Sequence, residues 1–206
     1  MASSWQRLGT VTYSTGTSLG IEDFTAMQHL KVEGFFKSAS GNCVANVRFN
    51  GDSDGNSKYP TRHQHNGGSE SSLASRNELE TYQLAPMGAG ESSYVVMDII
   101  NIANKEKLII GHTVHLADGT GASNAPKRNE FAIKWTTTSG QITRIDFINN
   151  DSGTLSTAST FTVWGADDIG STPFYPKLQD GSIYEEQDTG KIYIWKLSTN
   201  TWSEVT

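Results

Sequence analysis

The stretch YVVMDIINIANKEKLIIGHTVHL, residues 94–116, is the most apolar passage of the chain and decides the predicted fold. Its first arm, residues 94–102, is dense in β-branched side chains, which suit a pleated strand better than a helix. The second arm alternates with a period of two, as expected of a strand with one buried side. The apolar face of this arm carries Leu108, Ile110, His112, Val114 and Leu116. Because polar residues 104–107 separate the arms, the stretch predicts a β-hairpin.

The aliphatic face of this hairpin is expected to point into a hydrophobic core. An apolar hairpin of this length needs a second sheet to cover its buried face. The prediction is therefore an all-β chain built as an antiparallel β-sandwich or jelly roll. On this interpretation His112 is a hydrogen-bonded core histidine, and packing accounts for the aliphatic residues around it.

Other short runs of alternating apolar residues surround the hairpin and are bounded by turn clusters. Counted from Trp5, they give about eight or nine short strands, at spacings that suit an antiparallel sandwich. The side chains expected to face the core from these runs are Leu30, Val32, Phe36, Cys43, Ala45, Val47, Phe49, Phe131, Ile133, Trp135, Ile145, Phe147, Phe161 and Val163.

The chain has 206 residues, enough for one large β domain with a small appendage. The composition changes at residues 166–177, where glycine and proline interrupt any regular pattern. We therefore predict a β-sandwich domain over residues 1–168 and a linker over residues 169–180. The remaining residues, 181–206, predict a small C-terminal three-strand β-meander.

Charge and composition argue against several classes of partner. The formal net charge is −6 and no cluster of lysine and arginine occurs, so binding to nucleic acid is not expected, because phosphate neutralisation requires a basic face. No run approaches the roughly 18 apolar residues that span a bilayer, and the first residues lack a signal-peptide core, so we expect no membrane insertion. The single cysteine, Cys43, lies on the apolar side of a predicted strand and is interpreted as an inert core thiol.

Two patterns of potential metal ligands occur after Asn50. Asp52-x-Asp54-x-Asn56 has the oxygen-ligand spacing of a calcium loop, but the glycine and glutamate that complete such a loop are missing, and turn formation explains these residues as well.

His63-Gln64-His65 places two imidazoles on one face of an extended segment, and His112 and His115 are candidates to approach them. A zinc site needs three or four ligands, and no carboxylate or thiol stands at a matching spacing. We therefore predict neither a metal nor a cofactor.

No motif of enzymatic chemistry is present in the sequence. There is no nucleophile elbow, no phosphate-binding loop and no Cys/His pairing of recognised spacing. The carboxylate pairs Asp167-Asp168 and Glu185-Glu186 are adjacent, so their members face opposite ways in an extended chain. We predict that the protein is not an enzyme and has no catalytic residues.

Several aromatic residues leave two interpretations open. Tyr59, Tyr82, Trp195 and Trp202 could stack on sugar rings at an exposed surface. They could equally be buried between subunits, where tyrosine and tryptophan are also enriched.

The order of several segments resembles a group of small virion structural proteins of tailed bacteriophages. These segments are LKVEGFF, NVRFNGDSDGNSKY, TYQLAP, VVMDIINIANKEKLIIGHTV, NAPKRNEFAIKWTTTSGQITRIDFIN and FTVWGAD. The C-terminal segment GSIYEEQDTGKIYIWKLSTNTW is similar to short meanders of phage structural and fibre proteins. The resemblance implies a sandwich or jelly-roll subunit that is oligomeric, and it supplies no catalytic residues.

The leading functional hypothesis is a non-enzymatic virion subunit, such as an exposed capsid decoration, cement, head-spike or fibre protein. It is expected to form a homo-oligomer, predicted to be a trimer, to contact other virion proteins, and to be located in the virion after assembly in the host cytoplasm. The alternative is a tail-associated receptor-binding module that holds a host glycan with the loop over residues 51–75 and with exposed aromatic residues. A glycan-degrading enzyme is the third hypothesis.

Overall fold

The computed structural model describes residues 5–53, 58–65, 70–71, 84–116, 121–122, 125–167, 181–186, 188–196, 198–199 and 201–205. All secondary-structure elements in these residues are β-strands, and all their pairings are antiparallel. The prediction of an all-β antiparallel sandwich with a small three-strand C-terminal sheet is confirmed. None of the described residues forms a helix long and apolar enough to cross a membrane.

The chain divides into two compact units, residues 1–168 and residues 169–206. The predicted linker, residues 169–180, lies entirely outside the described residues.

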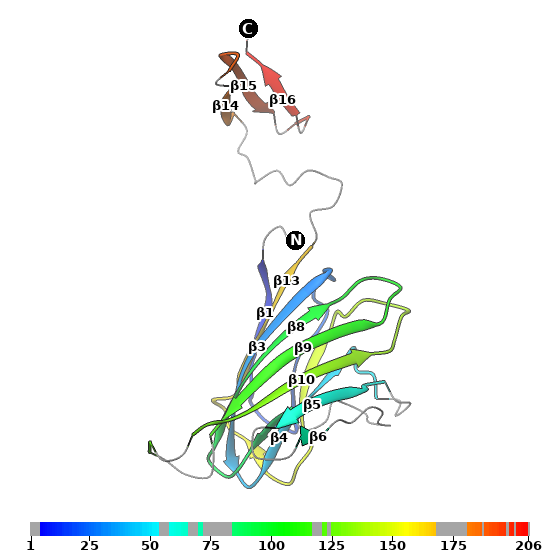
Figure 1. Ribbon diagram of the computed structural model, residues 1–206, viewed down its shortest axis with the longest axis vertical. Coiled ribbons are helices and arrows are strands. Elements are labelled where there is room, and N and C mark those ends of the chain that lie inside the picture. Colours follow the sequence, from blue (N-terminus) through cyan, green and yellow to red (C-terminus); the bar gives the residue numbers. More distant parts are fainter. Residues whose placement is uncertain are drawn as a thin grey trace. The chain divides into compact units, whose positions relative to one another are not determined.

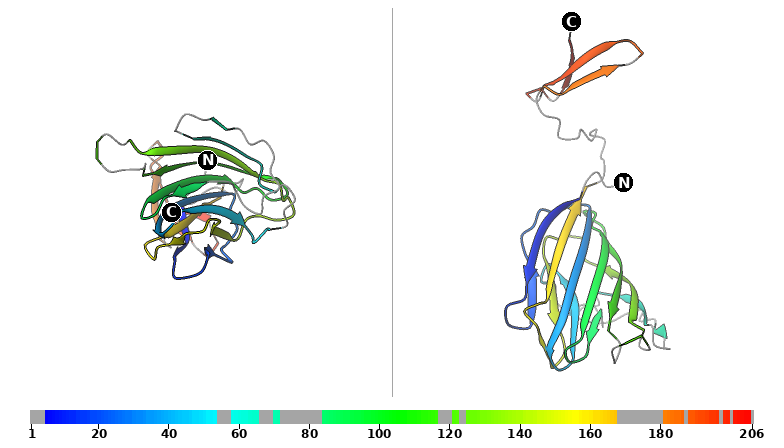
Figure 2. Two further views of the ribbon diagram at one scale, coloured as in Figure 1. Left: turned by 90° about the horizontal axis from the view of Figure 1, so that it is seen from below. Right: turned by 90° about the vertical axis from the view of Figure 1, so that its left-hand side faces the viewer.

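The first unit contains a large sheet and a smaller one, which form the two layers seen in Figures 1 and 2. The large sheet has the order β1 (Gln6–Thr12), β13 (Thr160–Ala166), β3 (His29–Ser40), β8 (Ser92–Ile100), β9 (Lys107–His115), β10 (Lys127–Trp135), β5 (Thr61–His65) and β6 (Glu70–Ser71), with β12 (Thr154–Leu155) paired to β3. The smaller sheet has the order β2 (Ser18–Ile21), β11 (Ile145–Asn149), β4 (Cys43–Phe49) and β7 (Ala85–Met87).

Aromatic side chains from both sheets fill the space between the layers. Phe147 of β11 lies 4.6 Å from Phe36 of β3 and 4.9 Å from Phe161 of β13, measured between ring centroids. At such distances an aromatic pair adds about 0.5–1.5 kcal/mol beyond the burial of its area. All fourteen side chains that the alternating runs outside the hairpin predicted to face the core are buried.

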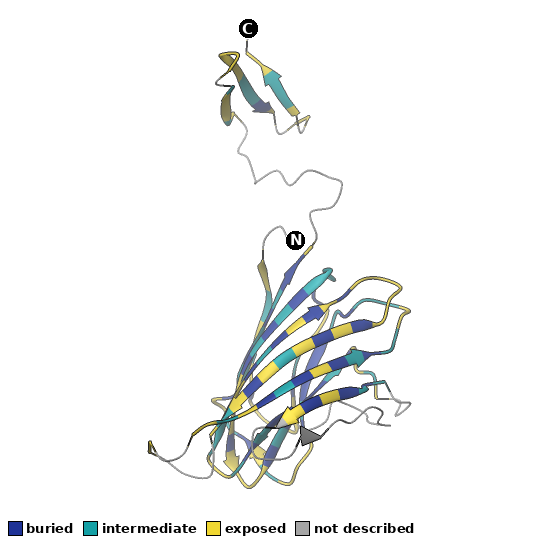
Figure 3. Cartoon of the chain, viewed as in Figure 1, coloured by how far each residue is buried: buried dark blue, intermediate teal, exposed yellow. Residues whose placement is uncertain are grey.

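Strand β9, in contrast, turns the opposite face inward from the one predicted. Ile109 is 1% exposed, whereas its neighbour Ile110 is 63% exposed. Figure 3 shows this alternation of buried and exposed residues along β8, β9 and β10. The prediction that the aliphatic face points into the core is therefore wrong, and so is the interpretation of His112 as a core histidine. The residues on the outer face are Leu108, Ile110, His112, Val114 and Leu116.

The register between β8 and β9 explains the orientation of β9. Directly opposite residues of an antiparallel pair place their side chains on the same face of the sheet. The buried residues of β8 and their partners on β9 are Val95 with Thr113, Met97 with Gly111, and Ile99 with Ile109. Once the apolar residues of β8 point inward, the aliphatic face of β9 must therefore point outward.

Gly111 fits this inward position because it has no side chain. A Cβ atom there would lie 2.4 Å from the carbonyl oxygen of Val96 and 2.6 Å from Cζ of Phe131. Phe131 pairs with Gly111 across the β9–β10 ladder, so its ring occupies the space that a β9 side chain would need. The inner face of β9 is thus filled by a side chain from β10.

Asn101 and Thr113 tie the hairpin to the rest of the sandwich through hydrogen bonds. The Asn101 side chain is fully buried, donates to the carbonyl oxygens of Met27 (2.9 Å) and Ile142 (3.1 Å), and accepts from the amide of Ile142 (2.7 Å). The Thr113 hydroxyl donates to the carbonyl oxygen of Leu84 over 2.7 Å. Because buried polar groups are costly when unsatisfied, these bonds favour a single register of the hairpin.

The second unit is a meander of β14 (Ile183–Glu186), β15 (Lys191–Lys196) and β16 (Thr201–Glu204). Its aromatic residues pack on one another: the ring centroids of Trp195 and Trp202 are 5.4 Å apart, and Tyr184 lies 6.0 Å from Trp202. Trp195 is buried by this packing. So small a sheet gains much of its stability from such an aromatic cluster.

Lys107 is a fully buried charged residue at the start of β9. Its ammonium group donates to the carbonyl oxygens of Lys105 and Thr137 and lies 5.8 Å from the ring centroid of Trp135. Burial lowers the pKa of Lys107 below its usual value. The unfolded chain therefore holds this proton more tightly than the folded chain does.

We predict that replacing Lys107 with methionine changes the pH dependence of stability in a defined direction. Between the lowered folded pKa of Lys107 and the ordinary lysine pKa of about 10.4, the unfolded state binds more protons, so the free energy of unfolding of the wild type rises with pH relative to that of Lys107→Met. Urea unfolding of both proteins from pH 7 to pH 10 measures this difference. If the free energy of unfolding of the wild type, relative to that of Lys107→Met, stays constant or falls over this pH range, the pKa of Lys107 is not lowered in the folded chain.

Candidate functional site

The outer face of the large sheet carries a band of large apolar side chains, which we call the apolar stripe. Its members are Phe35 of β3, Tyr94, Val96 and Ile100 of β8, and Leu108, Ile110, Val114 and Leu116 of β9 and the residue after it. Val96 is half-buried and the others are exposed. The alternation in the sequence predicted that the β9 part of the stripe lies in the core, so it did not indicate this surface.

The strand register makes the stripe continuous. Tyr94 pairs with Phe35 on one side and with Val114 on the other, so these three side chains form one row across β3, β8 and β9. Farther along the hairpin, Ile100 pairs with Leu108. Side chains of such neighbouring pairs are within contact distance on one face of a sheet.

Two polar side chains interrupt the stripe. Asp98 pairs with Ile110 on one side and with Lys31 on the other, and His112 pairs with Val96 and with Glu130. Both Asp98 and His112 are exposed. The stripe is thus apolar with two titratable groups within it.

Ion pairs border the stripe on both sides. On β3, Lys31 and Glu33 lie 3.4 Å apart, and on β10, Arg128 and Glu130 lie 3.1 Å apart. Exposed pairs of this kind add little stability. Their relevance is spatial, because an apolar centre with a polar rim is the usual composition of a protein–protein interface.

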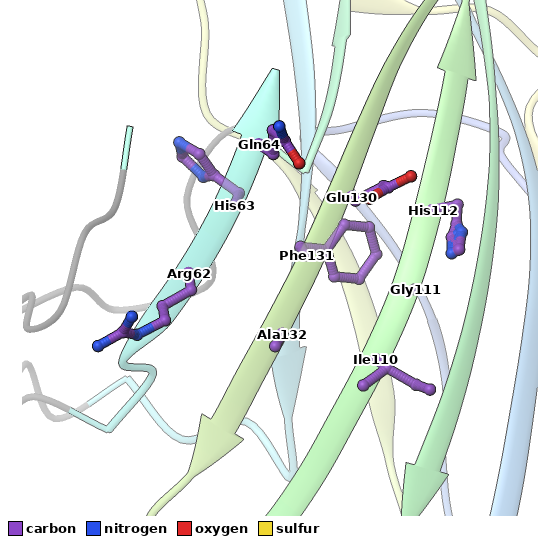
Figure 4. A pocket seen from close by; sticks show the side chains of 9 residues that line it. All are labelled: Arg62, His63, Gln64, Ile110, Gly111, His112, Glu130, Phe131 and Ala132. Carbon is purple, nitrogen blue, oxygen red and sulfur yellow. The ribbon is translucent and has the colours of Figure 1, made fainter. Parts of the chain in front are cut away.

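A shallow depression of about 360 Å³ lies at one edge of the stripe. It forms where Ala132 of β10 stands between Ile110 of β9 and Arg62 of β5 in one cross-strand row. Figure 4 shows these three residues in line across neighbouring strands, with Gln64, Glu130 and His112 in the next row along the same strands. The small side chain of Ala132 leaves space between its larger neighbours.

The stripe is at or above the upper end of the apolar patches that monomeric proteins usually expose. With roughly 150–250 Å² for a large side chain, a range set by the aromatic residues, the exposed fractions of its seven most open members leave about 500–850 Å² accessible to solvent. The largest patch on a typical monomer is about 300–600 Å² and often functional. The arrangement is therefore suited to binding another protein surface.

Asp52 of the predicted calcium loop has an internal role. Its carboxylate accepts hydrogen bonds from Nε1 of Trp135 and Oγ1 of Thr137, each over 2.9 Å, and lies 3.9 Å from Nζ of Lys58. Asp54 and Asn56 lie outside the described residues. The carboxylate of Asp52 thus anchors the side chain of a buried tryptophan.

The structure places two of the candidate zinc ligands, His63 and His112, apart from each other. His63 of β5 pairs with inward-facing Phe131, whereas His112 pairs with outward-facing Glu130, so these two imidazoles lie on opposite faces of the sheet. His115 is half-buried at the end of β9, and the side chain of His65 lies outside the described residues. Within the part of the chain that the structure describes, no group of three or more metal-ligating side chains occurs.

The aromatic residues considered for sugar stacking are mostly accounted for by packing. Tyr59 is buried, and its hydroxyl donates to the carbonyl oxygen of Asp52 and accepts from the amide of Phe49. The interpretation of Tyr59 as an exposed stacking residue is therefore wrong. Trp195 is buried and Trp202 half-buried in the meander, while Tyr82 lies outside the described residues.

The remaining candidate residues are the single cysteine and the two pairs of adjacent carboxylates. Cys43 is buried on β4 as predicted, and burial raises the pKa of its thiol. The Asp167 carboxylate accepts from the amide of Gln28 over 2.9 Å, and Asp168 lies outside the described residues. Glu185 and Glu186 are neighbours on β14 and so point to opposite faces of the meander.

Comparisons with protein-family models, with curated proteins and with solved structures found no match for this chain. The function of the chain is therefore inferred from its residues and from the surface that they form.

The neighbouring isoleucines of β9 offer a matched pair of substitutions. We predict that Ile109→Ala lowers the free energy of unfolding by about 2–5 kcal/mol, because it leaves a cavity in the core. Ile110→Ala should change the stability of the monomeric chain by no more than about 0.5 kcal/mol, because its side chain faces solvent. Urea unfolding at low protein concentration measures both values. Equal losses, or a larger loss for Ile110→Ala, would mean that β9 faces the other way.

Proposed function

We propose that this protein is a non-enzymatic structural subunit that acts through protein–protein contacts. The observation that carries the proposal is the apolar stripe on the outer face of β8 and β9. A surface of this size costs free energy when it is left in water, so it is suited to being covered by another protein surface. The rim of exposed ion pairs supports the same interpretation.

The setting that we propose is the virion of a tailed bacteriophage, with the protein as an exposed capsid decoration, cement, head-spike or fibre subunit. Support for this setting comes from the resemblance of the sequence to small phage virion proteins and from its C-terminal meander. The proposed partners are further copies of the chain, with the trimer as the predicted homo-oligomer, and other virion proteins. Assembly in the host cytoplasm and residence in the virion follow from the same proposal.

Host glycan adhesion is the alternative function. This alternative is based on aromatic residues that were expected to be exposed and on the polar loop over residues 51–75. Tyr59 and Trp195 are buried, and most of that loop lies outside the described residues. The contact surface on β8 and β9 therefore supports the structural role better than the adhesive one.

We predict that the chain is present in gradient-purified virions produced from the genome that carries its gene. Ile110→Asp should lower its amount per particle at least tenfold, because the new carboxylate stands directly opposite Asp98, and burying two neighbouring carboxylates adds like-charge repulsion to a large desolvation cost. Quantitative mass spectrometry of purified particles measures the incorporation.

Thr12→Asp is the matched control, because Thr12 is exposed on β1 at the far edge of the same sheet. Its incorporation should equal that of the wild type. Absence of the wild-type chain from the particles, or equal incorporation of Ile110→Asp, contradicts the proposed function.

A further inference from the structure

The area of the apolar stripe matches one side of a stable protein–protein interface. A standard interface buries about 800 Å² on each partner, and the stripe offers roughly 500–850 Å² of open surface before its polar rim is counted. One partner of ordinary size is therefore enough to cover it.

The charges around the stripe favour a partner whose surface also carries both signs. Lys31 and Glu33 border it on β3, and Arg128 and Glu130 border it on β10. Two further cations border the stripe, Lys37 on β3 and Lys134 on β10, and the ammonium group of Lys134 lies 3.0 Å from the carboxylate of Glu106. Both borders therefore carry both signs, which a partner with a mixed rim can match. A second copy of the chain presents the same mixed rim and the same apolar centre.

A projection and a depression lie on the same face of the sheet. Tyr94 of β8 is a large side chain with 47% of its surface exposed, and the depression beside Ala132 lies on the β10 side. Tyr94 pairs with Val114 of β9, and Ala132 pairs with Ile110 of β9. His112 is the outward residue of β9 between these two positions, so it stands midway between the projection and the depression.

We infer that a second copy of this chain docks face to face on the apolar stripe, with Tyr94 of each copy seated in the depression beside Ala132 of the other. A two-fold axis that lies between the two sheets and passes over His112 exchanges the projection with the depression. Such a contact is isologous, meaning that both copies use the same patch. The inference rests on the proposed function, because it names the partner of the contact surface proposed there.

The two polar interruptions of the stripe are compatible with this contact. Asp98 has Lys31 as its cross-strand neighbour on β3. The ammonium group of Lys31 lies 3.4 Å from the carboxylate of Glu33 in the single chain, and the carboxylate of Asp98 is also within reach of this side chain when water is removed. His112 lies at the axis, where the two copies bring identical residues together. A cross-linker between the two His112 positions therefore reports directly on the proposed symmetry.

The first test uses the full-length chain with His112→Cys and a short bis-maleimide cross-linker. Sheets packed face to face lie about 10 Å apart, a distance that such a reagent spans. We expect most of this variant to be captured as a covalent pair at micromolar concentration.

Wild-type protein controls for Cys43, which is buried, and Thr12→Cys controls for chance encounters at an exposed site of the same sheet. Both should remain almost entirely uncross-linked. Cross-linking of Thr12→Cys as strong as that of His112→Cys contradicts the inference.

The second test measures the self-association of the full-length chain by sedimentation equilibrium. The wild type should contain an even number of copies, either a dimer or, if the predicted trimer also forms through another surface, a hexamer. Tyr94→Ala removes the projection and Ala132→Trp fills the depression, so each should raise the dissociation constant of the pair at least tenfold. Both positions face outward, and unchanged circular dichroism at low concentration verifies that the fold is retained.

The outcomes separate this inference from the proposed function. If the wild-type chain sediments as a monomer or as a trimer at high concentration, and not as a dimer or a hexamer, the two-fold contact does not form. If the chain does not self-associate but Ile110→Asp is incorporated into particles less than the wild type, the stripe binds a different virion protein. The proposed function then stands. If the chain is absent from particles, the proposed function fails whatever its oligomeric state.

Discussion

The structure depends most on how β9 is paired between β8 and β10. Its two neighbours turn strongly apolar residues inward, and the register then determines which side chains of β9 follow them. At the centre of this arrangement Gly111 leaves room for the ring of Phe131. Since a shift of register by one residue would reverse every side chain of the strand, the aliphatic residues of β9 are held in contact with solvent.

The sandwich is complete without those aliphatic residues. Its core is packed by aromatic side chains from both sheets, such as Phe36, Phe147 and Phe161, and its polar groups are satisfied at positions such as Asn101 and Asp52. Burial of the apolar stripe is therefore not needed for the first unit to fold. The inner face of the large sheet is filled by the core, and the apolar outer face is exposed to contact with another protein. The fold is therefore suited to a role in assembly.

Much of this fold could be predicted from the sequence, because most strands bury only one face and show it as strict alternation. Cys43 and Trp135 are examples of residues whose burial follows directly from that pattern. The hairpin is different, since β9 is apolar on its outer face and carries Lys107, Gly111 and Thr113 on its inner face. Read alone, the strand indicates the wrong buried side, whereas pairing it with the inward residues of β8 gives the correct one. The buried position of Tyr59 was equally inaccessible, because it depends on contacts with Phe49 and Asp52 that only the folded chain brings about.

Whether the aliphatic face of β9 is exposed in the free chain and covered in the assembly is tested most directly by hydroxyl-radical footprinting of the full-length chain at low and high protein concentration. This method reports the solvent contact of individual side chains. If the aliphatic face of β9 is exposed in the free chain and covered in the assembly, Leu108 and Ile110 will be oxidised at low concentration and protected at high concentration. Ile109 and Met97 will be protected at both, because they lie in the core. Oxidation of Leu108 and Ile110 that is equally strong at all concentrations contradicts the covering of the stripe, and oxidation of Ile109 in preference to Ile110 contradicts the orientation of β9.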